Sequence, residues 1–242
     1  MREHELIEMI ANVQSGRLAR RDFVERMLGL GIGVPLASVL LASAGLAGAQ
    51  TAVGYKPTRR GGGGALKLLY WQAPTLLNPH FGTGAKDLAG SRLFYETLAR
   101  YDADANLVPV LAADIPSREN GGIAADGRST VWTLKKNVQW HDGKPFTADD
   151  VIFNWEFAAD PATAATTAGS YKDVKAVKID AYTVRVEFQK PTPYWADPFV
   201  GVVGMLIPKH LFEAYRGAKS REAPTNLKPV GTGAYKFTDF KQ

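Results

Sequence analysis

The chain has 242 residues, of which 45% are hydrophobic and 10% aromatic, and these values suit one sizeable globular domain or two small ones. Its formal net charge is +5 and no long basic stripe is present, which argues against a nucleic-acid-binding protein. It contains no cysteine, so disulfides, cysteine-ligated metal sites, thiol nucleophiles and a lipid-bearing N-terminal cysteine are excluded.

The N-terminal segment has the layout of an export signal. Arg20 and Arg21 precede Phe23, and an uncharged run over 27–55 follows. The arginine pair resembles the twin-arginine export signal, which a translocase reads as an address and which is not an anchor. Small residues toward the end of the run predict cleavage after Ala49, and the mature protein is then periplasmic. The run is also long enough to span a bilayer, so an uncleaved signal anchor is the alternative.

Three parts are therefore expected along the chain. Residues 1–49 form the twin-arginine-like signal peptide. Residues 50–64 form a flexible leader, because the stretch "YKPTRRGGGG" contains proline and four glycines but no apolar periodicity. The folded part is expected over 65–242.

The first elements of the folded part alternate between strand and helix. The apolar, aromatic run "ALKLLYW" (65–71) predicts a buried strand, and the stretch 73–87 that follows is a loop rich in proline, glycine and asparagine. A strand that leads into an irregular loop is a common place to meet a ligand. Apolar residues at near-helical spacing in 88–102 predict a helix, and 106–116 predicts a turn and an extended stretch.

The next stretch predicts a strand, a turn and a helix. Residues 131–134 alternate as in a strand, and Asp142–Gly143 is a strong turn signal. Thr147 is placed to cap a helix start, and Asp150, three residues later, makes a short-armed capping box. The helix is expected to end at Asp160–Pro161. Its buried face is predicted to contain Val151, Ile152, Trp155 and Ala158.

His141 and Asp142 form the one sequence pair that invites a catalytic interpretation. A hydrolytic triad needs a nucleophile held against the histidine, and neighbours at a turn rarely point at each other in that way. The chain also lacks a G-x-S-x-G nucleophile elbow. Turn residues are therefore the preferred interpretation. His80, His141 and His210 are too scattered to predict a metal site.

The C-terminal third predicts further strands and a helix. Two alternating stretches, 174–179 and 182–188, predict a hairpin across a short link. Pro208 is expected to open a helix. The stretch "KPVGTGAYKFTDF" (228–240) predicts a glycine turn followed by a strand that contains Tyr235, Phe237 and Phe240.

Several separate phrases carry a family resemblance. They are "TLLNPH", "SRLFYETLARYD", "WTLKKNVQWHDGKPFTADDVIFNWEF", "IPKHLFE" and "PVGTGAYKF". In this order they resemble the peptide and nickel class, family 5, of extracytoplasmic solute-binding proteins, which includes the dipeptide and oligopeptide receptors of ABC importers. The resemblance covers roughly 65–242, and its most specific part is the Trp-anchored strand with the turn and helix behind it.

The resemblance implies an α/β fold of the two-lobed, type II periplasmic-binding-protein kind, in which the lobes close around the ligand. Residues 65–242 are expected to form most of the first lobe and its attached subdomain, with the second lobe absent. Gln242 is then expected to be an artificial or frameshifted end. The acidic residue that holds a ligand's ammonium in peptide-binding relatives belongs to the second lobe and has no counterpart to assign here.

The resemblance also places a ligand-binding strip at Thr83, Gly84, Ala85 and Lys86. In peptide-binding relatives this part of the first lobe meets the ligand backbone, by strand addition. An ordinary strand-to-helix loop is the alternative.

Two departures bear on the choice of ligand. Asn78 stands where many relatives carry aspartate, and 165–171 lacks an aromatic residue at the point where some oligopeptide binders place one.

The expected function is that of a periplasmic, monomeric substrate-binding component, not an enzyme, that captures peptides or peptide-like solutes for an ABC importer. Its partners are the permease subunits in the inner membrane and, during export, the twin-arginine translocase. No cofactor, metal or nucleic acid is expected. The alternatives are a nickel-chelate, opine or sugar binder of the same family, a cofactor-dependent periplasmic enzyme, and a nonfunctional fragment whose half cleft binds far more weakly than an intact homologue.

Overall fold

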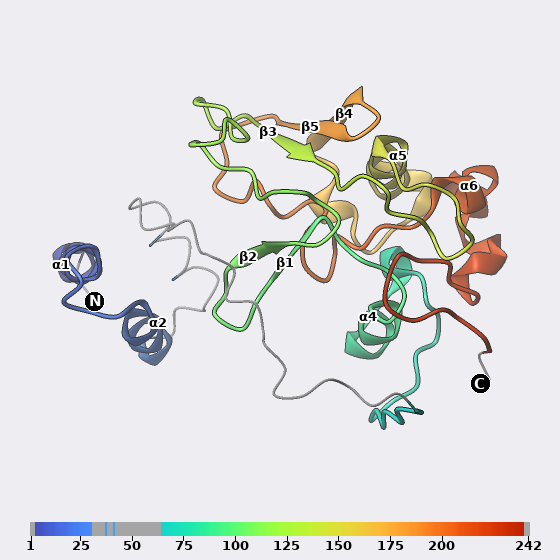
Figure 1. Ribbon diagram of the computed structural model, residues 1–242, viewed down its shortest axis with the longest axis horizontal. Helices are drawn as coiled ribbons and strands as arrows, with labels where there is room; N and C mark the ends of the chain where they lie inside the picture. Colours follow the sequence, from blue (N-terminus) through green and yellow to red (C-terminus); the bar gives the residue numbers. More distant parts are fainter. Residues whose placement is uncertain (1–2, 31–36, 38–40, 42–63, 240–242) are drawn as a thin grey trace. The chain divides into compact units, whose positions relative to one another are not determined.

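The computed structural model describes residues 3–30, 37, 41 and 64–239 (Figure 1). The predicted cleavage point after Ala49 and the last predicted strand residue, Phe240, lie outside the described residues. The chain divides into two compact units, one made of residues 1–64 with 101–108 and the other of 65–100 with 109–242.

Over residues 3–30, which the structure describes without a gap, the first unit forms helices α1 (Glu3–Gln14) and α2 (Arg20–Gly29). Its buried apolar residues are Val13, Phe23, Met27, Ala37 and Leu41. The arginine pair stands at the start of α2, and exposed Arg21 forms an ion pair with Glu25 at 3.0 Å. Within the described ranges, no helix is both long enough and apolar enough to cross a membrane.

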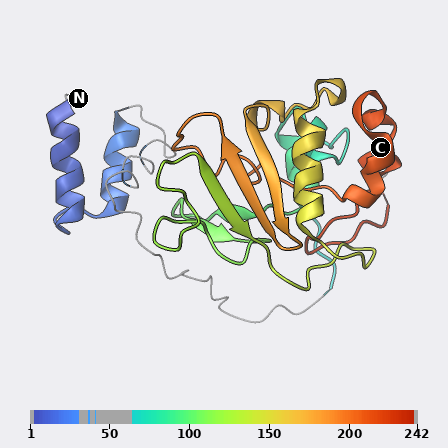
Figure 2. The same ribbon diagram turned by 90° about the horizontal axis from the view of Figure 1, so that it is seen from above.

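The second unit is organised around a three-stranded antiparallel sheet in the order β3-β5-β4 (Figure 2). The strands are β3 (Ser129–Thr133), β5 (Thr183–Phe188) and β4 (Val174–Asp180). Trp132 pairs with Val184, and both side chains are fully buried. The predicted strand and the predicted hairpin are therefore confirmed.

Helix α5 (Ala148–Ala159) packs against β4 and β5 (Figure 2). Its start follows the prediction, because the Thr147 hydroxyl accepts a hydrogen bond from the Asp149 N–H at 3.3 Å while the Thr147 N–H donates to the Asp150 carboxylate at 3.0 Å. Of the four residues predicted on its buried face, Val151 and Ala158 are buried and the other two are half-buried. In the second unit, the largest fully buried side chains are Phe81, Tyr95, Trp132, Trp140, Phe146, Phe153, Phe157, Tyr171, Phe199 and Phe212.

We expect Thr147→Ala to lower the free energy of unfolding by about 1 kcal/mol, because the exposed amides at the start of α5 lose their side-chain acceptor. Urea denaturation followed by circular dichroism measures the change. The matched control is Thr238→Ala, at an exposed threonine outside any helix or strand. An equal effect of the two substitutions would contradict the capping role.

The helix predicted over 88–102 is only partly correct. Helix α4 (Ala85–Ser91) is short, and the chain then turns and enters β1 (Ala99–Tyr101), which pairs with β2 (Leu107–Pro109). The Leu98 N–H donates to the Phe199 carbonyl, and the Leu98 carbonyl accepts from residues 110 and 112. Pairing with distant segments thus overrides the local helical spacing.

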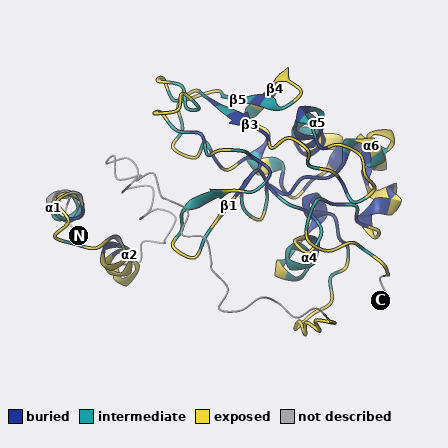
Figure 3. Ribbon diagram, in the orientation of Figure 1, coloured by how far each residue is buried: buried dark blue, intermediate teal, exposed yellow. Residues whose placement is uncertain are grey.

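Two predicted strands are wrong. Residues 65–71 belong to no strand and are exposed, as Figure 3 shows, with Leu69 fully exposed and Trp71 75% exposed. Residues 234–239 also have no regular structure. A strand is stable only when a neighbour pairs its backbone groups, and within the described part of the chain no strand runs beside either segment.

Short helical segments complete the unit. Helix α6 (Lys209–Phe212) begins directly after Pro208, close to the predicted start. The 3₁₀ helices are η2 (Pro79–Phe81), η3 (Pro161–Thr163), η4 (Ala168–Ser170), η5 (Glu213–Tyr215), η6 (Gly217–Glu222) and η7 (Pro224–Asn226). The ring of Phe81 in η2 lies 5.9 Å from that of Phe157 in α5, which fixes η2 on the helix.

Candidate functional site

The four residues predicted to bind ligand, Thr83 to Lys86, span the end of the loop after η2 and the first two residues of α4, and they are called the strip below. Thr83 and Ala85 are exposed, while Gly84 and Lys86 are half-buried. Gly84 is the N-cap residue of α4 and has an extended backbone, with φ −163° and ψ 174°. The strip thus leaves η2 in a strand-like conformation and turns into a helix at Ala85.

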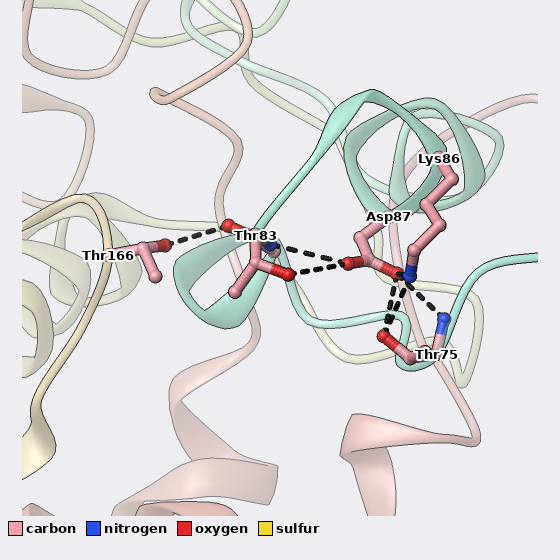
Figure 4. Close-up of polar contacts among 6 residues, drawn as sticks. Thr75, Thr83, Lys86, Asp87 and Thr166 are labelled. Atoms are coloured by element: carbon pink, nitrogen blue, oxygen red, sulfur yellow. Dashed lines mark hydrogen bonds and ion pairs between the residues drawn. The ribbon is translucent and has the colours of Figure 1, made fainter.

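The carboxylate of Asp87 joins the strip to the preceding loop (Figure 4). One oxygen accepts hydrogen bonds from the N–H and the hydroxyl of Thr75, at 2.7 and 3.0 Å. The other accepts from the N–H and the hydroxyl of Thr83, at 3.3 and 3.4 Å. The Asp87 side chain itself is fully buried, while Thr83 is exposed.

The ammonium of Lys86 closes the same cluster (Figure 4). It lies 2.8 Å from the Asp87 carboxylate and 3.0 Å from the Thr75 hydroxyl, and its side chain is only 12% exposed. Burial alone raises the pKa of the Asp87 carboxyl, but the hydrogen bonds from Lys86 and the two threonines outweigh it and hold the pKa at about 2. The Asp87 carboxyl is therefore ionised at neutral pH, and the Lys86 ammonium lies against it.

The backbone groups of the strip differ in whether the protein pairs them. The Gly84 carbonyl accepts from the N–H groups of Asp87 and Leu88, at 3.1 and 3.2 Å. By contrast, the N–H groups of Gly84 and Ala85 and the carbonyl of Thr83 have no hydrogen-bond partner within the described part of the chain. The first amides of a helix have no partner inside it, so these groups are available to a ligand.

Thr166 anchors the segment that enters the strip. Its N–H and its hydroxyl both donate to the His80 carbonyl, at 2.8 and 3.0 Å, and the hydroxyl also lies 3.0 Å from the Gly82 carbonyl. The segment before the strip is thus fixed by Thr166 and the segment after it by Asp87.

A buried polar network lies beneath η2. The Asn154 side-chain nitrogen donates to the carbonyls of Asp150 and Ile207, and its oxygen accepts the Ile207 N–H at 2.9 Å. Because that oxygen is an acceptor, the His80 Nε2 at 3.0 Å carries the proton, and Nδ1 accepts from the Thr167 hydroxyl at 2.7 Å. Burial lowers the pKa of His80 to about 4, so this imidazole is neutral at pH 7.

His141 and Asp142 do not face one another. The His141 Nδ1 accepts the Gly231 N–H at 3.2 Å, and Nε2 lies 2.8 Å from the Gly233 carbonyl. Asp142 instead contacts the His210 Nε2 at 2.7 Å. Both ring nitrogens of His141 are therefore engaged by the backbone of the glycine turn, an arrangement that holds two segments together and offers no base to a nucleophile.

A surface hollow of about 350 Å³ adjoins the strip through Thr75. Its other lining residues are Leu76, Phe81, Arg221, Glu222, Ala223, Pro224, Asn226 and Leu227. The Arg221 guanidinium lies 4.4 Å from the centre of the Phe81 ring, so the hollow has an apolar floor beside a cation. Among the described residues, no three histidine, aspartate or glutamate side chains are arranged to hold a metal ion.

Sequence reasoning missed most of this cluster. The strip itself was located by family resemblance, but nothing in the spacing of Thr75, Asp87 and Thr166 marked them as partners. Asp87 in the first turn of α4 is the one local hint, because aspartate is common near helix starts.

The chain matches the family model of the bacterial extracellular solute-binding proteins, family 5, over residues 106–242. The periplasmic murein peptide-binding protein MppA of Escherichia coli is 26% identical in an alignment of 180 residues that covers 67% of this chain and 31% of MppA. The oligopeptide-binding protein AppA of Bacillus subtilis is 29% identical over 171 residues, which are 70% of this chain and 30% of AppA. The chain therefore spans about a third of the length of these relatives.

Solved structures give the same result. The crystal structure of NikZ from Campylobacter jejuni with Ni(L-His) matches 71% of this chain and 32% of NikZ, with 29% identity and a TM-score of 0.60. The structure of B. subtilis AppA with a nonapeptide matches 70% of this chain and 33% of AppA, with 25% identity and a TM-score of 0.63. The expected mixed α/β fold of the two-lobed, type II kind is confirmed for the matching part.

Proposed function

We propose that the chain, which belongs to the family 5 bacterial extracellular solute-binding proteins, serves as the substrate-binding component of an ABC importer. In this role it captures peptides or peptide-like solutes. The observation that carries this proposal is the strip, which has backbone groups without a partner in the described part of the chain and is held in place from both sides. Relatives named as oligopeptide-binding proteins support the choice of a peptide.

The strip suits recognition by strand addition. In an extended chain, residues two apart direct their backbone groups to the same side. The Thr83 carbonyl and the Ala85 N–H stand in this relation, and Gly84 between them is extended. An extended peptide laid along the strip donates one backbone hydrogen bond and accepts another. These groups are common to all peptides, so affinity at the strip does not depend on the ligand's sequence.

Export and partners complete the proposal. The arginine pair at Arg20 and Arg21 directs the chain to the twin-arginine translocase, cleavage follows Ala49, and a monomer acts in the periplasm with inner-membrane permease subunits. Residues 1–49 are then the signal, 50–64 the leader and 65–242 the folded part. The chain performs no catalysis in this role. Relatives named as periplasmic binding proteins support the location.

A nickel chelate is the second candidate ligand. It is favoured by the match to NikZ, whose structure contains Ni(L-His). The residues that the structure describes provide no three-ligand metal group, so a chelate would be recognised through its organic part.

Calorimetric titration with tri-alanine tests the proposal through Ala85→Pro. Proline is tolerated at the first position of a helix, and Ala85 holds that position in α4, so the substitution removes one N–H and keeps the fold. We expect the affinity for tri-alanine to fall about tenfold, the equivalent of one hydrogen bond.

Ala85→Gly, which keeps the N–H, is the matched control and should bind as the wild type does. Equal affinity of the proline and glycine variants would refute binding at the strip. Binding of Ni(L-His) without binding of tri-alanine would establish the second candidate instead.

A further inference from the structure

We propose that Asp87 is a positioning residue that sets the geometry of the strip and cancels the charge of Lys86, so that the strip accepts solutes through uncharged amide groups. This inference rests on the proposed function for its ligand, but the positioning role of Asp87 concerns the free protein alone.

The positioning role follows from how the donors divide between the two carboxylate oxygens. Each oxygen accepts an N–H and a hydroxyl from one threonine, Thr75 on one side and Thr83 on the other. These threonines belong to segments that no strand pairing connects within the described part of the chain. Asp87 is therefore the direct link between the loop before η2 and the first residue of the strip.

The charge role follows from the direction of the Lys86 side chain. A lysine in a binding strip would ordinarily offer its ammonium to a ligand, and it would favour acidic solutes. Here the ammonium is turned onto Asp87 and Thr75, and little of the side chain is exposed. The neighbouring hollow carries one further charge of each sign, at Arg221 and Glu222. The described residues of the strip cluster and the hollow thus carry no excess charge.

Asp87→Asn is the discriminating substitution. Asparagine has the same shape but only one acceptor oxygen, and its NH₂ group would face the N–H of Thr75 or of Thr83. One of the two links is therefore lost, and Lys86 loses its counter-ion. The matched control is Asp150→Asn, because the buried Asp150 carboxylate also accepts backbone N–H groups from two segments, at Thr147 and Lys209.

The first measurement is NMR-detected amide hydrogen exchange of the ligand-free, full chain. We expect the amide of Thr75 or of Thr83 to exchange at least about tenfold faster in Asp87→Asn than in the wild type, as a lost hydrogen bond predicts. In Asp150→Asn the amides of both threonines should exchange at the wild-type rate. Unchanged exchange of both amides in Asp87→Asn would overturn the positioning role. If Asp87→Asn does not fold, Thr75→Val, which removes one hydroxyl of the cluster, should give a smaller rise at Thr83, and no rise would count against the proposal.

The second measurement compares Ala-Ala-Ala with Ala-Glu-Ala as probes. The wild type should bind the two peptides within about threefold of each other, whereas Asp87→Asn should prefer Ala-Glu-Ala by at least about fivefold because Lys86 is left unbalanced. The double variant Asp87→Asn/Lys86→Met should lose that preference and bind the two peptides equally. If the preference came from a structural defect instead, removal of the Lys86 charge would not abolish it. A wild-type preference for Ala-Glu-Ala, or no preference in Asp87→Asn, would overturn the charge role.

The two measurements separate two kinds of failure. If the wild type binds neither peptide, the proposed peptide function fails, while amide exchange still decides the positioning role of Asp87.

Discussion

Replacing Gly231 by alanine is expected to lower the free energy of unfolding by about 3 kcal/mol, the upper range for forcing extra atoms into a packed site. A Cβ atom at Gly231 would lie 1.8 Å from the Phe94 carbonyl oxygen and 2.4 Å from its carbon. These neighbours are backbone atoms and cannot rotate away. The glycine turn would have to shift, and its hydrogen bonds with His141 would lengthen or break.

Urea unfolding at neutral pH measures this effect. Gly169→Ala is the matched control, since a Cβ atom there meets nothing within 4 Å. The family phrase "PVGTGAYKF" contains Gly231. The expected result would mean that glycine is required at this position because the Phe94 backbone leaves no room for a side chain. Equal unfolding free energies of the two alanine variants would show that the turn adapts without cost.

Acid is expected to destabilise the protein through His80. Burial lowers the His80 pKa from 6.5 to about 4 in the folded state. The unfolded chain therefore binds this proton first as the pH falls, and stability that is fully present above about pH 6.5 is lost by about pH 4. The shift corresponds to a loss of about 3 kcal/mol. Urea unfolding at several pH values across this window measures it.

His80→Gln serves as the test variant, because it lacks the titrating group and should show a smaller pH slope between about pH 6.5 and pH 4. Thr238→Ala, at an exposed threonine that has no titrating group, is the control substitution and should retain the wild-type slope. Identical slopes for the wild type and His80→Gln would contradict the assignment of the neutral, buried imidazole.

The parts of the fold that sequence reasoning predicted are those governed by local chemistry. The start of α5 depends on Thr147 and Asp150, three residues apart, and the end depends on Asp160–Pro161. The β4-β5 hairpin also joins neighbouring segments. In each case the interacting residues are close in sequence, so the local sequence pattern was enough to predict the element.

The errors share a different cause. The segments 65–71 and 234–239 have the composition of strands, but a strand also requires a partner, and composition does not supply one. The Leu98 region has helical spacing, yet its backbone pairs with Phe199, about a hundred residues along the chain. Long-range pairing decided these elements, and a single sequence contains little information about it.

In the candidate site, too, some features could be predicted from the sequence and others depend on long-range contacts. The position of the strip at Thr83 to Lys86 came from family resemblance and is still a prediction. The contacts that hold it, from Asp87 to Thr75 and from Thr166 to Gly82, link loops whose sequences show no shared pattern. The network of His80 and Asn154 joins residues 74 positions apart. Only the folded arrangement shows that these polar groups satisfy one another.

The most direct test of peptide capture at the strip is to follow backbone amide NMR signals of the full chain during titration with tri-alanine. We expect saturable shifts of the Gly84 and Ala85 amides, which have no partner within the described part of the chain, while the amide of Val184 in the central sheet stays unchanged. Saturable shifts that leave Gly84 and Ala85 unaffected, or no shifts at any peptide concentration reached, would contradict peptide capture at the strip.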